Sequence, residues 1–209
     1  MKDFRILTKE QKDLLEAQCN PKTLTGCRNI AIIAFLRSTG CRVSELTSLC
    51  HNKIDLKTSE VQLFGKGEKK RRVGVDLASM RKILLWVEKK VEKFGKSKGE
   101  DPFFCAVRSG VFGSAKCAPG KSAAGSKLSR QSVFKMLQSK GRLAGVAGGI
   151  GREIFPHLFR HSRACECVEN MSLKNVQDML GHENITTTTK YLRGLNPQLM
   201  IDKMKSLPS

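Results

Sequence analysis

The chain has 209 residues, with 38 Lys and Arg against 19 Asp and Glu, which gives a formal charge of 38 − 19 = +19. This length fits one domain or one domain with a tail, and a hydrophobic content of 40% excludes a wholly disordered chain. The positive charge makes a polyanion the first partner to consider, and the longest apolar run, residues 30–36, is too short to span a bilayer.

The N-terminal half predicts three helices followed by a hairpin. Thr8 opens a short helix over 8–18, a strongly apolar helix covers 26–38 and ends near Gly40, and a third begins around Arg42. Residues 60–64 and 71–75 are predicted to form two short strands. The glycine-punctuated turn 65–70 between them predicts a β-hairpin with lysines at its tip. An amphipathic helix over 78–94 follows.

The C-terminal half begins with a basic stretch and ends in helices. Residues 102–152 contain nine basic and no acidic residues, which favours a surface held against phosphates. Residues 110–128, rich in Gly, Ser, Ala and Lys, predict a flexible basic loop. Helices are expected over 157–170, from Ser172 to Gly181, and over 186–192 and 197–205. We therefore expect a mainly α fold with a small antiparallel β-sheet.

The N-terminus indicates the cellular compartment of the chain and, through it, the redox state of the cysteines. The first residues lack the apolar stretch of a secretory signal, so we expect a cytoplasmic protein without a membrane anchor. In that reducing compartment the eight cysteines remain thiols. No Cys-x2-Cys pair and no acidic or histidine cluster suggests a metal, so we expect neither a metal nor a cofactor.

Several polar residues together fit phosphodiester cleavage, although each alone has an ordinary structural explanation. Arg42 and Glu45 are three apart on one helix, as are His157 and Arg160 on another, so each pair shares a face. Tyr191 is the only tyrosine of the chain. Such cleavage needs a nucleophile, a proton donor and fixed charge on the phosphate, which guanidinium groups supply without a metal.

Four segments carry a family resemblance. They occur in the family's order along almost the whole chain: Thr39-Gly40-Cys41-Arg42-Val43-Ser44-Glu45-Leu46, Gly65-Lys66-Gly67-Glu68-Lys69-Lys70-Arg71, His157-Leu158-Phe159-Arg160-His161-Ser162, and Leu180-Gly181-His182 followed by Tyr191. In these segments the chain resembles the catalytic domain of the tyrosine recombinases, the phage-integrase and Xer group. The resemblance implies the DNA breaking-rejoining fold and site-specific recombination of double-stranded DNA.

The resemblance also implies residue roles. Tyr191 would be the nucleophile and form a 3′-phosphotyrosyl link. Arg42 and Arg160 would hold the scissile phosphate. The general acid would be Lys66, proton transfer would be assisted by His157 and His182, and Arg42 would be oriented by Glu45. We also predict a set of DNA-binding residues, which are Lys69, Lys70, Arg71, Lys127, Arg130 and Lys135.

Domain organisation and assembly follow from the same resemblance. We expect a catalytic domain over 1–195 and a tail helix over 196–209 that docks on a neighbouring protomer. Self-association into a tetramer is expected on DNA, with a monomer off DNA. Only 41 residues precede Arg42, so we expect that the family's N-terminal core-binding domain is absent. Gly74 stands where the family's hairpin usually has proline.

Two alternatives remain open. A type IB topoisomerase-like enzyme would share the tyrosine chemistry but relax supercoils as a monomer. A DNA-binding regulator without catalysis could use residues 173–189 as a helix-turn-helix. An RNA-binding protein has little support, because only 6% of the residues are aromatic.

Overall fold

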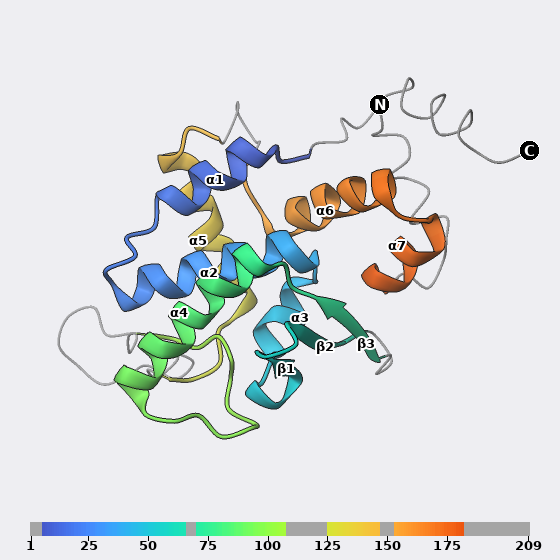
Figure 1. Cartoon of the computed structure of the whole chain (residues 1–209). Coiled ribbons are helices and arrows are strands. Elements are labelled where there is room, and N and C mark those ends of the chain that lie inside the picture. Colours follow the sequence, from blue (N-terminus) through green and yellow to red (C-terminus); the bar gives the residue numbers. More distant parts are fainter. Residues whose placement is uncertain (1–5, 66–69, 108–124, 147–152, 182–209) are drawn as a thin grey trace, which may run out of the picture.

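The computed structural model describes residues 6–65, 70–107, 125–146 and 153–181 (Figure 1). They form a mainly helical fold with one three-stranded sheet, which confirms the predicted fold class. No helix among them is long and apolar enough to cross a membrane.

Helix α2 (Leu24–Thr39) is the centre of the core. Residues 31–36 are at most 1% exposed, so this stretch of the helix is apolar on all sides, as a fully buried stretch must be. Helix α4 (Leu77–Phe94) runs alongside it (Figure 1). The single tryptophan, Trp86, is fully buried on α4 and its indole N–H donates to the carbonyl oxygen of Phe103 at 3.1 Å.

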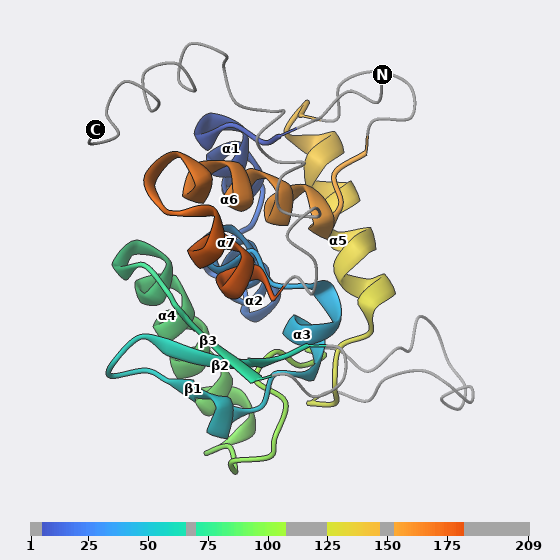
Figure 2. The same cartoon turned by 90° about the vertical axis from the view of Figure 1, so that its right-hand side faces the viewer.

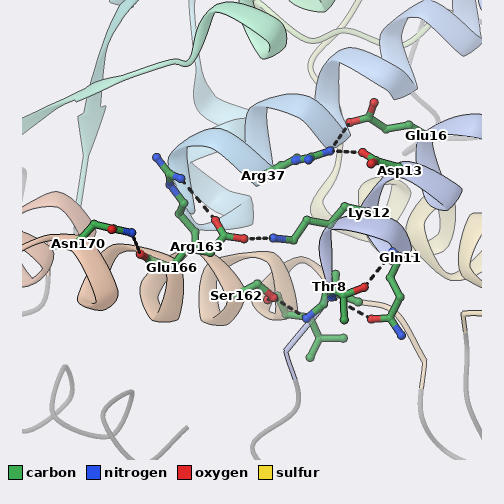
Figure 3. A network of polar contacts seen from close by, with 12 residues as sticks. Thr8, Gln11, Lys12, Asp13, Glu16, Arg37, Ser162, Arg163, Glu166 and Asn170 are labelled. Carbon is green, nitrogen blue, oxygen red and sulfur yellow. Dashed lines mark hydrogen bonds and ion pairs between the residues drawn. The ribbon is translucent and has the colours of Figure 1, made fainter. Parts of the chain in front are cut away.

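Helix α1 (Lys9–Ala17) is fixed against α2 and α6 (Pro156–Asn170) by polar contacts that Figure 3 shows from close by. The amide of Leu7 donates to the Ser162 hydroxyl at 2.7 Å. Lys12, whose side chain is 1% exposed, pairs with Glu166 (Figure 3). An ammonium group so deeply buried requires such a partner, so this pair ties α1 to α6.

The sheet follows the order β1-β2-β3 and is antiparallel throughout. A short 3₁₀ helix, His51–Lys53, leads into β1 (Ile54–Asp55), and β2 (Glu60–Phe64) and β3 (Lys70–Gly74) form the predicted hairpin. Strand β1 was not predicted, because two residues carry no alternation. Val61 pairs with Val73, and both are buried against the helices.

Three described helices remain, and one of them, α7, lies beside the hairpin. They are α3 (Val43–Ser48), α5 (Arg130–Leu143) and α7 (Leu173–Leu180), and α7 contacts both α6 and β3 (Figure 2). A small apolar cluster that includes Cys165, Val168, Val176 and Leu180 joins α7 to α6. The end of α7 therefore lies next to β3.

The predicted helices and caps agree closely with the structure, and some predictions fall outside it. The last two predicted helices, 186–192 and 197–205, and the docking of the tail lie outside the described residues. The end of the predicted flexible loop is held by backbone bonds: the Gly125 amide donates to Ala106, and the Ala106 amide donates to Ser126. The seven described cysteines are free thiols, as expected.

Candidate active site

Arg42 is positioned by the way in which α2 ends. Gly40 caps α2 in the left-handed region (φ 59°), where a Cβ would lie 3.1 Å from the Cβ of Arg163. Glycine is favoured there because it has no Cβ to strain or to clash. The chain then extends to Arg42, the N-cap residue of α3, whose side chain is 37% exposed. Arg42 is thus open to a ligand at a fixed point of the backbone.

Glu45 lies in the first turn of α3, and its carboxylate is 2% exposed. It accepts hydrogen bonds from the Arg42 amide at 2.7 Å and from Arg42 Nη1 at 3.2 Å. It also accepts from Arg71 Nη1 and Nη2, both at 2.7 Å. Burial alone would raise the pKa of Glu45, but the hydrogen bonds and charges of Arg71 and Arg42 outweigh it and hold the pKa below its usual value.

Arg160 connects α6 to two other elements of the site. Pro156 occupies the first position of α6, which places His157 in the first turn and Arg160 one turn further along. Arg160 is 1% exposed, and it donates through Nη1 to the Gly40 carbonyl at 3.1 Å and through Nη2 to the Leu180 carbonyl at 2.7 Å. It therefore joins the ends of α2 and α7.

His157 and His161 stack edge to face on α6, with ring centroids 4.5 Å apart. Burial lowers the pKa of His157, and the charges of Arg160 and Arg42 lower it further. His157 is therefore neutral at pH 7 and can accept a proton. Burial also lowers the pKa of His161, to about 4, with His157 and Arg160 contributing.

The C-terminal end of α7 contacts guanidinium groups from three different elements. Arg71 Nε donates to the Met179 carbonyl at 2.8 Å, and Arg42 Nη2 donates to the Gly181 carbonyl at 3.1 Å. With the Arg160 contact to the carbonyl between them, three consecutive carbonyl groups are bound. The negative end of a helix dipole favours such cations. Gly181 directly precedes His182 in the sequence.

A mainly apolar hollow of about 610 Å³ lies beside Arg42 and His157. The N-terminal end of α5 contributes Arg130 and Phe134 to its wall, and Phe155 contributes from the segment before α6. Sequence reasoning missed Phe134, because its exposure becomes apparent only once Val133 and Leu137 are seen to form the buried face of α5. The hollow brings a predicted DNA-binding residue, Arg130, close to two predicted catalytic ones.

Five of the six predicted DNA-binding residues are described by the structure, and they fall into two groups. The exposed ones that the structure describes are Lys70, Lys127, Arg130 and Lys135. Arg71 differs, because its side chain is 9% exposed and its charged end contacts Glu45. This placement does not support the prediction that Arg71 contacts DNA.

Four predicted site residues lie outside the described residues, namely Lys66, Lys69, His182 and Tyr191. Within the described parts of the chain, no group of three or more His, Cys, Asp or Glu residues could hold a metal ion.

Comparison with known proteins finds similarity to tyrosine recombinases. The sequence model of the phage integrase family matches residues 5–196. A tyrosine recombinase XerD from Oceanobacillus iheyensis is 34% identical over 189 residues, which are 89% of this chain and 56% of that protein. XerD from Bifidobacterium longum is 31% identical over 177 residues, 84% of this chain and 52% of the relative. The chain thus spans about half the length of these relatives.

Solved structures support the same fold. The transposon Tn1549 integrase in complex with transposon right end DNA has a TM-score of 0.73 at 17% identity, covering 100% of this chain and 68% of that one. The XerH site-specific recombinase bound to a difH substrate, a post-cleavage complex, has a TM-score of 0.71 at 20% identity, covering 96% and 52%. The XerA recombinase has a TM-score of 0.69 at 22% identity, covering 98% and 66%.

Proposed function

The chain belongs to the phage integrase family, and we propose on that basis that it acts as a tyrosine-type site-specific recombinase on double-stranded DNA. Its high positive charge, +19, suits a phosphate polymer. The exposed cations Lys70, Lys127, Arg130 and Lys135 are available for contacts to the phosphates.

One observation supports this proposal above the others. Arg42 and Arg160 lie 160 − 42 = 118 residues apart in the sequence. They nevertheless bind adjacent carbonyl groups at the end of α7, those of Gly181 and Leu180. Two guanidinium groups are thus brought to one helix end, and one of them, Arg42, lines an open hollow together with neutral His157. Fixed cations of this kind can stabilise a phosphoryl transition state.

The proposed cleavage step forms one bond to phosphorus and breaks another. The phenolic oxygen of Tyr191 attacks the scissile phosphorus, a Tyr–O–P bond forms, and the bond from phosphorus to the 5′-oxygen breaks. Lys66 gives a proton to the leaving 5′-oxygen, and His182 or neutral His157 accepts the phenolic proton. The products are a 3′-phosphotyrosyl link and a 5′-hydroxyl. Attack by a 5′-hydroxyl of the partner strand reverses the step and completes strand exchange.

The two arginines have different access to the phosphate. Arg42 is partly exposed, so it can contact a phosphate oxygen directly. Arg160 is buried under the carbonyls of Gly40 and Leu180, so direct contact requires these covering groups to move when DNA binds. The proposal therefore includes a local rearrangement around the end of α7.

We further propose that the reaction takes place in a tetramer of protomers on DNA and needs neither metal nor nucleotide cofactor. Adduct formation then continues in the presence of a chelator. It weakens steeply with salt, because phosphate contacts dominate affinity.

The test is incubation with a nicked suicide DNA substrate, from which the cleaved fragment is lost, followed by denaturing electrophoresis. The wild-type chain should give a covalent protein–DNA band, and Tyr191→Phe should bind DNA without giving one. Supercoil relaxation without recombinant product would favour the topoisomerase-like alternative. DNA binding by the wild-type chain without any adduct would favour a regulator and would overturn the proposal.

A further inference from the structure

Arg71 and Arg72 are neighbours on β3 with opposite environments. The side chain of Arg71 is 9% exposed, whereas that of Arg72 is 79% exposed. Successive residues of a strand point to opposite faces, so Arg71 shares the inner face with buried Val73. A charged group on the inner face requires dedicated partners.

The partners of Arg71 come from two other elements of the site. Nη1 and Nη2 donate to the two carboxylate oxygens of Glu45, both at 2.7 Å, which is the bidentate geometry of a strong ion pair. Nε donates to the carbonyl of Met179 at 2.8 Å. One side chain on the hairpin thus contacts both α3 and the last turn of α7.

The pair with Arg71 changes the charge that Arg42 can offer to a phosphate. Glu45 also contacts Arg42, and if it paired with Arg42 alone, the two charges would cancel. With Arg71 included, the group of two arginines and one glutamate keeps a net charge of 2 − 1 = +1. Arg71 therefore lets Glu45 hold Arg42 in place without removing its charge.

The contact with α7 is close enough to restrict the sequence. A Cβ at Gly181 would lie 3.1 Å from Arg71 Nη1, and the backbone there has a φ of 65°. Both features favour glycine at the position directly before His182. The Arg71 guanidinium thus packs tightly against the end of α7, where the chain enters the segment with the remaining predicted site residues.

We infer that Arg71 is a positioning residue for phosphodiester cleavage rather than a DNA contact. It neutralises Glu45, so that Arg42 stays both fixed and positively charged, and it holds the end of α7. This inference rests on the proposed function.

The first test is the salt dependence of DNA binding, which is independent of cleavage. The slope of log K against log salt is negative, and on duplex DNA each lost phosphate contact makes it less steep by about 0.9. Because Arg71→Gln alone would leave Glu45 to cancel the charge of Arg42, the test uses the double variant Arg71→Gln/Glu45→Gln, in which the group keeps a net charge of +1. This double variant should keep the wild-type slope. The matched control is Arg72→Gln, which removes an exposed arginine from the same strand. A slope that is less steep by about one unit in Arg71→Gln/Glu45→Gln would overturn the assignment.

The second test measures the rate of adduct formation at saturating DNA. Misplacing a catalytic group by about 1 Å can cost about 100-fold, so Arg71→Gln should lose rate on that scale. Arg72→Gln should stay near the wild-type rate. The Arg71→Lys variant keeps the charge but not the fork and should recover part of the loss. Thermal unfolding of each variant shows whether it is folded.

The third test asks whether the charge of Arg42 accounts for the effect of Arg71. In the double variant Arg71→Gln/Glu45→Gln no carboxylate remains to cancel Arg42, so adduct formation should be faster than in Arg71→Gln alone. A methylphosphonate at the scissile position carries no negative charge, so the gap between the wild-type chain and Arg71→Gln should narrow on that substrate. An unchanged gap, or a double variant no faster than the single one, would overturn the inference.

Failure of the proposed function can be distinguished from failure of the inference about Arg71. If the wild-type chain binds DNA but forms no adduct, the recombinase proposal fails. The salt slope of Arg71→Gln/Glu45→Gln then decides alone whether Arg71 contacts a phosphate.

Discussion

The Arg71→Gln substitution removes the buried partner of Glu45 and should lower the free energy of unfolding. Breaking a buried ion pair by truncating one member typically costs about 3–5 kcal/mol, because the other charge is left without compensation. Arg42 still contacts Glu45 through its amide and its Nη1, so we expect Arg71→Gln to lie at the lower end, about 3 kcal/mol. For a domain of this size, each 1 kcal/mol lowers Tm by about 2–4 °C, which gives a fall of about 6–12 °C.

A double-mutant cycle measures this pair directly. Glu45→Gln should also destabilise, because it leaves two guanidinium groups at a buried site. The double variant should lose less than the sum of the two single losses, by roughly 2 kcal/mol, within the range found for contacting residues. Urea unfolding can be followed by the fluorescence of Trp86, the only tryptophan, which is fully buried.

The pH dependence provides a further check on the same pair. Because the pKa of Glu45 is lowered in the folded chain, its stabilising contribution is present above the unfolded pKa, about 4.3, and is lost as pH falls through the folded value. In Arg71→Gln, the loss of the Arg71 hydrogen bonds and charge should raise that pKa, so between pH 7 and 5 the carboxyl should take up more protons than in the wild-type chain. The stability gap to the wild-type chain should therefore narrow over that interval. A gap that is independent of pH, or additive single losses, would refute the reasoning.

Three further predictions concern stability. His51 and His161 have their pKa values lowered to about 4, in each case chiefly by burial, so the unfolded chain binds more protons and the urea midpoint should fall as pH drops from about 6.5 towards 4. Glu166→Ala should cost about 1–3 kcal/mol in urea unfolding, because it removes the carboxylate that pairs with buried Lys12. Gly181→Ala should cost about 1–2 kcal/mol, because its backbone is left-handed.

Matched controls separate these effects from general sensitivity. Glu92→Ala removes an exposed ion pair with Lys89 and should cost less than about 1 kcal/mol. A Cβ at Gly74 would meet nothing within 4 Å, so Gly74→Ala should be tolerated. If these controls were as damaging as the test variants, the assigned contacts would not explain the losses. A urea midpoint unchanged between pH 7 and 5 would contradict the histidine prediction.

The parts of the fold set by local interactions could be predicted from the sequence. The N-caps Thr8 and Ser172 and the C-cap Gly181 act within one turn, so the helix ends that they define were predicted correctly. Strand β1 is defined only by its pairing with β2, and its two residues carry no pattern of their own.

Arg71 illustrates the limit for the candidate site. Among many basic residues, charge alone indicated DNA contact. Arg71, Val73 and Val75 are spaced two residues apart, so they share one face of the strand, and both valines are 5% exposed. This spacing was the signal that Arg71 lies on the inner face. Which residue neutralises the buried arginine could not be predicted, because Glu45 lies 26 residues away and meets it only in the folded chain. The burial of Arg160 between two carbonyl groups depends on tertiary structure in the same way.

We propose that the phenolic oxygen of Tyr191 forms the covalent bond to the cleaved DNA strand. The most direct test is digestion of the adduct formed on a suicide substrate, followed by mass spectrometry of the nucleotide-linked peptide. The account predicts a 3′-phosphate attached to Tyr191 and a free 5′-hydroxyl on the released strand. A nucleotide attached to any other residue, or through a 5′-phosphate, would contradict it.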